Sequence, residues 1–408
     1  MISTAPEVDR LIDANAPIII CVSGGKDSQI VAEQVVTYAR NHNHTGDLIL
    51  CYSDLGRVVW SDAGWQCRQL AERLGVRLQV VGRAAGGLME RWTKRWQDNL
   101  TRYKDLSCVK LILPWSTPSM RFCTSELKTA IIQSWIRKTY KQPVVCVLGI
   151  RRDESRSKMS GRGAAPVFKL HHIRNGKKPP LPEGSIDWNA IVEVKTDTIF
   201  QIIRSGAQPI PSAYQFGSSR FSCCFCIMAT ASDLLAATRD PRNHDLYREQ
   251  CELEIASTFS FQANKWLSDV APELLTETQR ARLPQAKVRA AKREEIESEI
   301  PTHLLYVKGW PLAVPTFQEA SLIAETRRRI AEVLGIDIQH TTALSVSHRY
   351  AELIRLKEEK ESRRQQARSA THCSETQLRL NESGQAQLFS WSTLNTHPPS
   401  TTTALESK

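Results

Sequence analysis

Residues 17–28 read PIIICVSGGKDS, and this stretch decides the fold that we expect. Its first six residues are apolar and predict a buried strand, and residues 29–40 predict a helix. The glycines between them let the backbone approach a ligand closely, and the N–H groups and dipole of a helix N-terminus favour an anion. We therefore predict a phosphate-binding loop, which is not a Walker A loop because Asp27 stands where that motif has Ser or Thr. Its residues are Ser23, Gly24, Gly25, Lys26, Asp27 and Ser28.

Strand-like and helix-like segments alternate through the first 150 residues. The apolar runs at 17–22, 47–53, 77–81 and 144–150 predict strands, and the segments at 29–40, 63–74 and 131–140 predict helices. Continuous apolar strands separated by helices are typical of an α/β fold with a doubly wound parallel sheet. Ligands bind such sheets at the carboxyl ends of the strands, and SGGKDS follows such an end.

Composition restricts the class of protein. The chain has 408 residues with a net charge of +11 and a pI near 9.2, which favours an anionic partner, either nucleotide or nucleic acid. The polar segment 1–15 predicts no secretory signal, and no apolar run approaches the ~20 residues of a membrane helix. We expect a cytoplasmic protein with no membrane partner, in which the eleven cysteines are reduced thiols.

The pattern divides the chain into four parts. Residues 1–230 form the predicted nucleotide-binding domain with its cysteine cluster. Residues 231–345 form a smaller helical module with amphipathic segments near 231–238, 245–256, 285–299 and 317–334. Residues 346–368 predict a charged helix, and residues 369–408 are rich in Ser, Thr, Gln and Asn and predict a disordered tail.

Two further strand ends carry polar residues. Asp54, in the sequence YSDLG, could hold the sugar or base of a nucleotide or help to hold a metal ion. Gly149 opens the sequence GIRRDES, in which arginines can bind phosphate or sulfate in a bidentate manner and an acid can orient them. The residues that we assign to this anion site are Arg151, Arg152, Glu154 and Arg156.

Cysteines flanked by cations form the remaining motifs. In RFCTSELK, Arg121 and Lys128 flank Cys123, an arrangement that lowers a thiol pKa and suits an anionic substrate. In SRFSCCFC, Arg220 precedes a C-x-x-C pair with the spacing of zinc or iron–sulfur ligands. A redox pair is the alternative, but nothing nearby suggests a thioredoxin fold, and a four-cysteine zinc site would need a second close pair. We expect a [4Fe–4S] site on Cys123, Cys223 and Cys226, with Cys224 or Cys251 as candidates for the fourth ligand.

The ordered set SGGKDS, YSDLG, RFCTSELK, GIRRDES and SRFSCCFC resembles the phosphoadenosine phosphosulfate (PAPS) reductase-like branch of the PP-loop ATP pyrophosphatases. It is most similar to the Dnd-type sulfurtransferase of DNA phosphorothioation. The resemblance implies the adenine nucleotide alpha hydrolase-like fold, with Ser23 to Ser28 binding the phosphates of ATP. It also implies that Cys123, Cys223 and Cys226 are cluster ligands or handle sulfur, and that four cations contact anionic groups, namely Arg121, Lys128, Arg151 and Arg156.

The function that the resemblance implies is cleavage of Mg-ATP to AMP and pyrophosphate, adenylation of a substrate and transfer of sulfur, with Lys26, Asp27 and Cys123 as catalytic residues. DNA is a candidate acceptor, and a cysteine desulfurase is a candidate sulfur donor. The alternatives are a PAPS or adenylylsulfate reductase that forms sulfite, and a non-catalytic nucleotide- or DNA-binding subunit of a defence complex. The ECGLH motif of assimilatory PAPS reductases is absent from the sequence, which favours the first interpretation over the reductase. The stretch RWTKRW at 91–96 could bind a polyanion or form an amphipathic helix with its tryptophans inward.

Overall fold

The computed structural model describes residues 2–154, 164–173, 179–205 and 209–366. These residues form two compact units. Unit 1 comprises residues 1–102 and 111–295, and unit 2 comprises residues 103–110 and the chain from 296 onward. Residues 231–295, which the sequence analysis assigns to the helical module, thus group with the sheet. The predicted tail at 369–408 lies outside the described residues.

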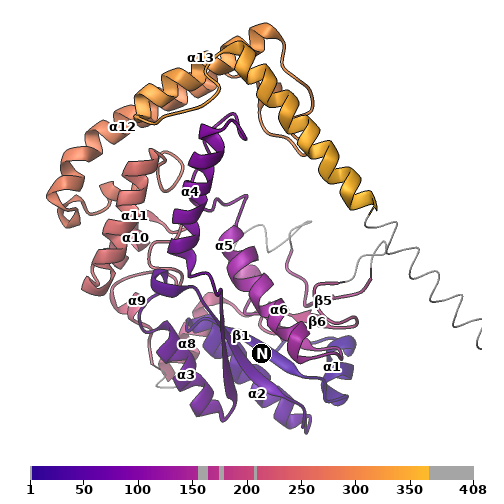
Figure 1. Ribbon diagram of the computed structural model, residues 1–408. Coiled ribbons are helices and arrows are strands. Elements are labelled where there is room, and N and C mark those ends of the chain that lie inside the picture. Colours follow the sequence, from indigo (N-terminus) through magenta and orange to yellow (C-terminus); the bar gives the residue numbers. More distant parts are fainter. Residues whose placement is uncertain (1, 155–163, 174–178, 206–208, 367–408) are drawn as a thin grey trace, which may run out of the picture. The chain divides into compact units, whose positions relative to one another are not determined.

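A six-stranded sheet organises unit 1 (Figure 1). Its order is β3-β2-β1-β4-β6-β5, and all neighbours are parallel except β5 and β6. The predicted α/β fold with a parallel sheet is confirmed, with the addition of an antiparallel edge strand. The strands are β1 (Ile18–Val22), β2 (Leu48–Asp54), β3 (Arg77–Gly82), β4 (Val145–Val147), β5 (Phe168–Leu170) and β6 (Ile186–Trp188).

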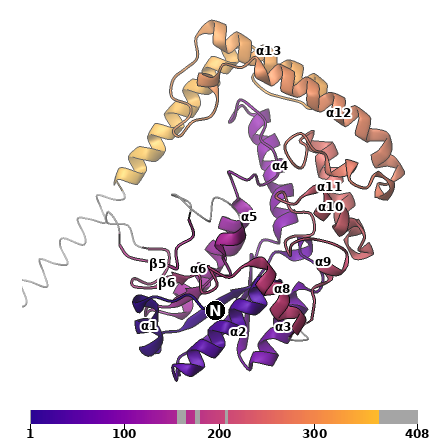
Figure 2. The ribbon, with the colours of Figure 1, turned by 180° about the vertical axis from the view of Figure 1, so that it is seen from behind.

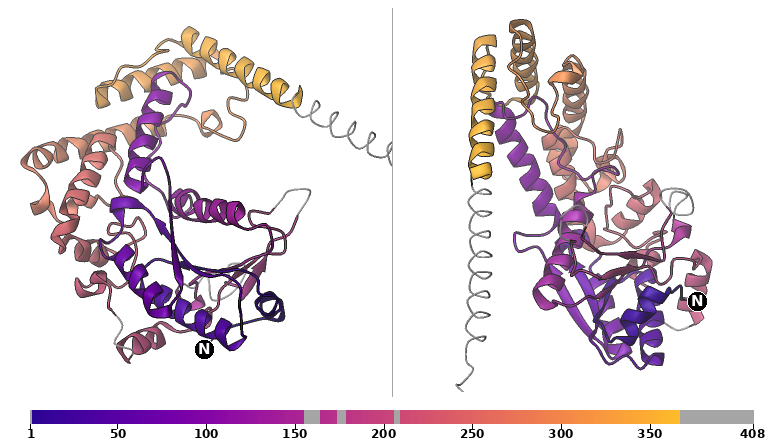
Figure 3. Two further views of the ribbon diagram at one scale, coloured as in Figure 1. Left: turned by 60° about the horizontal axis from the view of Figure 1, so that its bottom comes forward. Right: turned by 90° about the vertical axis from the view of Figure 1, so that its right-hand side faces the viewer.

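Helices cover both faces of the sheet. One face packs against α1 (Pro6–Asp13), α2 (Lys26–Asn41), α3 (Ala63–Leu74) and α8 (Thr196–Ser205), as Figure 2 shows from behind. The other face packs against α6 (Ala130–Thr139), the magenta helix that lies against the sheet in Figure 3. The first turn of α6 lies near the carboxyl ends of β1 and β4, and residues of all three elements line a cavity there.

The chain reverses its direction of travel across the sheet at β1. It moves from β1 to β2 and β3 on one side and then returns to place β4 and β6 on the other. The carboxyl ends of β1 and β4 therefore flank the point where strand order reverses, which is where ligands bind in open α/β sheets. SGGKDS follows β1, and GIRRDES follows β4.

Helices beyond the sheet complete unit 1. α4 (Leu88–Lys104) contains the stretch 91–96 and buries Trp92 and Trp96, so these rings are not available to stack on bases. Trp92 also packs edge-on against Trp115, whose ring meets Phe261, and this contact joins the segment after α11 to unit 1. The other helices are α5 (Phe122–Thr124), α9 (Ser212–Gln215), α10 (Ala231–Thr238), α11 (His244–Ser257) and α12 (Glu277–Ser298).

Unit 2 is a small helical core built from two distant pieces of chain. Leu106 and Val109 pack with Ile300 and with α13 (Phe317–Leu334) and the helix at residues 343–366. The predicted amphipathic segment at 317–334 is thus helical, and so is the predicted charged helix at 346–368 as far as residue 366, where the described chain ends. No helix in the described part of the chain combines the length and apolar character needed to cross a membrane. Short 3-10 turns occur at Gly56–Val58, Arg152–Glu154, Pro241–Asn243, Leu267–Asp269, Pro272–Leu274 and Thr302–Leu304.

Candidate anion and nucleotide site

The loop after β1 has a conformation that requires both of its glycines. Gly24 has φ of +82°, and a Cβ there would lie 2.8 Å from the carbonyl oxygen of Ala63. A Cβ on Gly25 would lie 2.9 Å from the Cβ of Phe221. Only glycine combines a positive φ with such close approach, so the backbone here is both strained for other residues and tightly packed.

The N-terminus of α2 faces the site without a side-chain cap. Its N-cap residue is Gly25, which has no side chain to accept from the first helical N–H groups. Ser28 instead closes the loop, because its hydroxyl accepts from the backbone N–H of Ser23 at 2.9 Å and lies 2.9 Å from the Ser23 hydroxyl. The first turn of α2 is thereby left to bind an external anion.

Asp27 joins two buried cations beside this loop. Its Oδ2 accepts from Lys26 Nζ at 2.9 Å, and its Oδ1 accepts from Arg151 Nε at 2.7 Å. The side chains of Lys26 and Arg151 are only 7% and 3% exposed. Because both carboxylate oxygens are engaged, Asp27 acts here as the partner that holds the two cations rather than as a free base or metal ligand.

Arg151 donates hydrogen bonds from its backbone N–H, its Nε and its Nη1, but not from its Nη2, within the described residues. Its Nη1 donates to Val194 O at 3.2 Å and to Thr196 Oγ1 at 3.1 Å, and its backbone N–H donates to Glu154 Oε1 at 3.0 Å. In the described structure its Nη2 makes no hydrogen bond, although the residue lines a cavity. An arginine fixed in this way presents unused donors to an anion.

A cavity of about 530 Å³ brings the predicted anion-binding groups together. Its wall includes the loop after β1, Gly149 from the end of β4, and Arg220 from the segment before the cysteine pair. Three cations from three separate motifs thus converge on one polar cavity. The predicted residues that line it are Ser23, Lys26, Asp27, Ser28, Gly149, Arg151, Glu154 and Arg220.

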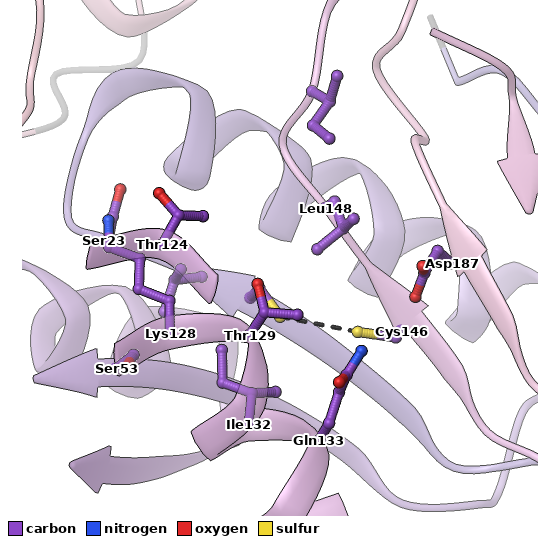
Figure 4. Close-up of a pocket in the computed structure, with 13 residues that line it drawn as sticks. Ser23, Ser53, Thr124, Lys128, Thr129, Ile132, Gln133, Cys146, Leu148 and Asp187 are labelled. Atoms are coloured by element: carbon purple, nitrogen blue, oxygen red, sulfur yellow. Dashed lines mark hydrogen bonds between the residues drawn. The ribbon is translucent and has the colours of Figure 1, made fainter. Parts of the chain in front are cut away.

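A second cavity of about 310 Å³ adjoins the first and is more apolar (Figure 4). The two share a wall formed by Cys21, Ser23, Leu148 and Ile150. The second lies between the sheet and the start of α6, and Ile132 and Gln133 line its helix side. Lys128, from the π-helical turn Ser125–Thr129, lines it as well.

The thiols of the two cysteine motifs share one environment. The pKa of Cys223 is raised to about 12, mainly by burial. The Lys128 ammonium lowers this pKa, and the nearby thiols of Cys226 and Cys123 raise it. RFCTSELK and SRFSCCFC are therefore neighbours in space. However, the described residues contain no group of three or more His, Cys, Asp or Glu side chains placed to hold a metal ion. As placed, the residues do not fit an iron–sulfur cluster, which stays a prediction.

The two candidates for a fourth cluster ligand, Cys224 and Cys251, are buried in the core of the protein. Cys224 is buried, and its thiol donates to Asn243 Oδ1 at 3.3 Å. Cys251 is fully buried on α11, where burial raises its pKa. Both thiols have the surroundings of packed core residues.

Three other predicted residues line neither of the two cavities, and a fourth is not described. Asp54 lines a separate cavity of about 680 Å³. Arg121 is exposed, with its Nη2 3.4 Å from the Thr124 hydroxyl. Arg152 donates to Ala165 O at 3.0 Å and pairs with Glu193. Arg156 lies outside the described residues.

The sequence analysis missed several groups at the site. Thr196 fixes Arg151 from the start of α8, and Phe221 packs on Gly25. Asp187 of β6 lines the second cavity, and His171 lies beside it. Phe221 could have been found from its position within SRFSCCFC. Asp187 lies in a three-residue strand and His171 directly follows another, and strands this short show no periodic pattern.

Comparison with known proteins gives one weak structural likeness. No family model and no curated protein matches the chain. Among solved structures, the chain is similar to the phosphate complex of phosphoadenylyl-sulfate (PAPS) reductase from Candida auris, at 13% identity and a TM-score of 0.33. The match covers 54% of this chain and 96% of that one. A likeness this weak carries no argument about activity, which has to come from the site itself.

Proposed function

We propose that this protein is a PP-loop enzyme of the PAPS reductase-like type that binds ATP and cleaves it to AMP and pyrophosphate. The observation that carries the proposal is the pair of adjoining cavities at the switch point of the sheet. The cavity of about 530 Å³, which we call the phosphate cavity, is polar and is lined by three cations and an uncapped helix N-terminus. The cavity of about 310 Å³, which we call the base cavity, is apolar enough for a base. A nucleotide has the same two-part character, with phosphates at one end and a flat heterocycle at the other.

In this proposal the loop and its cations act on the leaving pyrophosphate. The N–H groups at the start of α2, together with Lys26 and Arg151, stabilise negative charge that builds up on the β-phosphate as the bond to the α-phosphate breaks. A Mg²⁺ ion bound with ATP would neutralise further phosphate charge. An oxygen of the acceptor attacks the α-phosphorus, so that the acceptor receives AMP and pyrophosphate leaves.

Sulfur transfer is the second part of the proposal. The thiols of Cys123, Cys223 and Cys226 share an environment with Lys128, which also lines the base cavity. We propose that the terminal sulfur of a Cys123 persulfide, loaded by the sulfur donor, attacks the adenylated acceptor and displaces AMP. The thiolate of Cys223 then attacks the Cys123 sulfur, which breaks the S–S bond, releases the sulfur on the acceptor and leaves a Cys123–Cys223 disulfide that an external thiol reduces. We assign no step to an iron–sulfur cluster. DNA is the acceptor that we propose to test first, with a cysteine desulfurase as the candidate sulfur donor.

The test uses anaerobically purified protein with Mg-ATP, with and without duplex DNA, and measures AMP and pyrophosphate. Release of both products in equal amounts supports the proposal, and stimulation by DNA supports DNA as the acceptor. If ATP stays intact and PAPS gives sulfite, the protein is a reductase of activated sulfate. If it binds ATP and DNA but does neither reaction, it is a nucleotide-binding subunit.

Two lysine variants make the assay specific. Lys26→Ala removes a buried ammonium from the phosphate cavity and is expected to lower AMP release at least about 100-fold. Lys292→Ala removes an exposed ammonium whose ion pair with Glu295 lies on α12, and is expected to leave the rate unchanged. Equal rates in the two variants would contradict the assignment of the phosphate cavity.

A further inference from the structure

The base cavity contains one acid on a sheet face that is otherwise apolar. Asp187 is the middle residue of β6, and its neighbour in register on β4 is Cys146, which pairs in turn with Ile19 of β1. These positions point to the face covered by α6, where the core residues are Ile, Val, Leu, Cys and Tyr. An acid at such a position needs a polar partner, because burying a lone carboxylate is costly.

The nearest polar side chain of the protein makes no hydrogen bond with this carboxylate, because His171 Nε2 is a buried nitrogen without a hydrogen-bond partner among the described residues. His171 Nε2 lies 3.0 Å from Asp187 Oδ2, and the two side chains are 3% and 20% exposed. Asp187 Oδ1 makes no hydrogen bond within the described residues, and Lys169, its neighbour in register on β5, makes no ion pair with it there. Asp187 therefore lines the cavity with a carboxylate that accepts no hydrogen bond from the described residues, and a donor on a ligand can supply one.

Asp187 lies at the end of the cavity that is far from the phosphate loop. Its register partner on β4 is Cys146, which pairs with Ile19 of β1, and Ser23 follows Ile19 four residues later, which is about 13 Å along a strand. Figure 4 shows Ser23 and Asp187 on opposite sides of the cavity, with Gln133 and Cys146 close to Asp187. In a nucleotide the ribose lies between phosphate and base, so the group that reaches Asp187 belongs to the base.

We propose that Asp187 determines base specificity by accepting a hydrogen bond from an exocyclic amino group, so that the site takes adenine nucleotides and rejects a purine without that amine. This inference rests on the proposed binding of ATP. The carboxylate is an acceptor only, which complements the 6-amino group of adenine. The Gln133 amide on the opposite wall can donate to the adjacent ring nitrogen. A base without the amine would leave a half-buried carboxylate oxygen unpaired.

The test compares ATP with purine riboside 5′-triphosphate, which has hydrogen in place of the 6-amino group. Dissociation constants for both are measured by titration calorimetry with the full-length protein. We expect the wild-type protein to bind ATP at least about tenfold more tightly, as for a charge-assisted hydrogen bond. We expect Asp187→Ala to reduce this ratio to within about threefold, mainly by weakening ATP. The exposed Glu183, in the turn before β6, provides the matched control Glu183→Gln, which should keep the wild-type ratio.

The outcomes separate this inference from the proposed function. Equal binding of the two nucleotides by the wild-type protein overturns the inference but leaves ATP binding intact. A wild-type ratio retained in Asp187→Ala also overturns it, because another group must then read the base. Failure of the wild-type protein to bind either nucleotide overturns the proposed function and the inference with it. If Asp187→Ala does not fold, the isosteric Asp187→Asn replaces it, and its ratio should fall at least about threefold.

Discussion

Two buried arginines, one in each unit, show what distinguishes a binding site from a structural contact. Arg151 in unit 1 is 2% exposed, and Arg327 in unit 2 is 0% exposed. The Arg327 guanidinium donates to the backbone carbonyls of Tyr103, Lys104 and Gln339, and thereby links segments that lie far apart in the sequence. Arg151 pairs with Asp27 and lines a cavity, and its Nη2 makes no hydrogen bond within the described residues. Burial is common to both, so it is the unused donor beside a cavity that indicates an anion site.

The largest expected effect contrasts these two arginines directly. Arg151→Gln should weaken Mg-ATP binding about 100-fold, because it removes a positive charge and an unused N–H donor from the phosphate cavity. Arg327→Gln should leave the affinity within about twofold but lower the free energy of unfolding by about 3 kcal/mol, since buried carbonyls lose their donors. Titration calorimetry and urea unfolding measure the two quantities. Equal losses of affinity in both variants would remove the distinction.

A pair of glycines extends the contrast to the backbone. Gly24 has φ of +82°, and a Cβ added to it would lie 2.8 Å from Ala63 O, whereas Gly335, which ends α13, has φ of +66° and open space around it. Gly24→Ala should weaken ATP binding about tenfold and lower the unfolding free energy by about 2 kcal/mol. Gly335→Ala should cost about 1 kcal/mol of stability and no affinity. If the two variants behave alike, the loop does not depend on the close approach at Gly24.

The capping acids Asp233 and Glu319 should make stability fall at low pH in both units. Burial raises the pKa of Asp233, but hydrogen bonds from Ser219 and Thr230 lower it below its usual value on balance. Hydrogen bonds from His303 and Thr316 lower the pKa of Glu319 to about 2. A carboxyl whose pKa is lower in the folded state stabilises the fold above its unfolded pKa of roughly 4, and this stabilisation is lost as pH falls through the folded value.

Variants at these two acids test the pH effect by urea unfolding from pH 7 down to pH 2. Asp233→Asn and Glu319→Gln should each flatten the loss of stability below about pH 4.5. Only Asp233→Asn should also weaken ATP binding, by about threefold, because Asp233 holds Ser218 and Ser219 next to Arg220. An unchanged pH profile in both variants would contradict the assignment of these acids.

The smallest expected effect concerns Arg152, the neighbour of Arg151. Its guanidinium is engaged by Ala165 O and Glu193, and it lines neither cavity of the candidate site. Arg152→Ala should therefore change ATP affinity less than about twofold, as is usual for surface ion pairs. A loss close to that of Arg151→Gln would show that both arginines of GIRRDES bind the ligand.

Local patterns predict much of the fold. The predicted helix at 63–74 coincides with α3, and the predicted strand and helix around SGGKDS coincide with β1 and α2 to within a few residues. The four amphipathic segments from residue 231 onward are all helical. Local apolar patterns or a glycine turn mark these elements, so neighbouring residues are enough to indicate them.

Contacts between distant segments could not be predicted in this way. β5 and β6 have three residues each, too few for a periodic signal, and their pairing brings His171 to Asp187 across a turn. Nor does GIRRDES indicate which of its arginines is buried, because that depends on Asp27 and on Val194 and Thr196 before α8. The sequence thus indicated the glycine loop after β1 but not the far wall of the second cavity, where Asp187 lies.

The division of unit 2 along the chain has a consequence for how the protein folds during synthesis. Its core needs Leu106 and Val109, yet their partners include Val346 and Tyr350, and Arg349 bonds Asp105 across 244 residues of chain. Domains generally fold as units while synthesis proceeds. The apolar side chains of the segment 103–110 therefore remain exposed to solvent until nearly the whole described chain has left the ribosome. Closing so long a loop is slow, and chaperone dependence and late burial of this segment are the expected signatures.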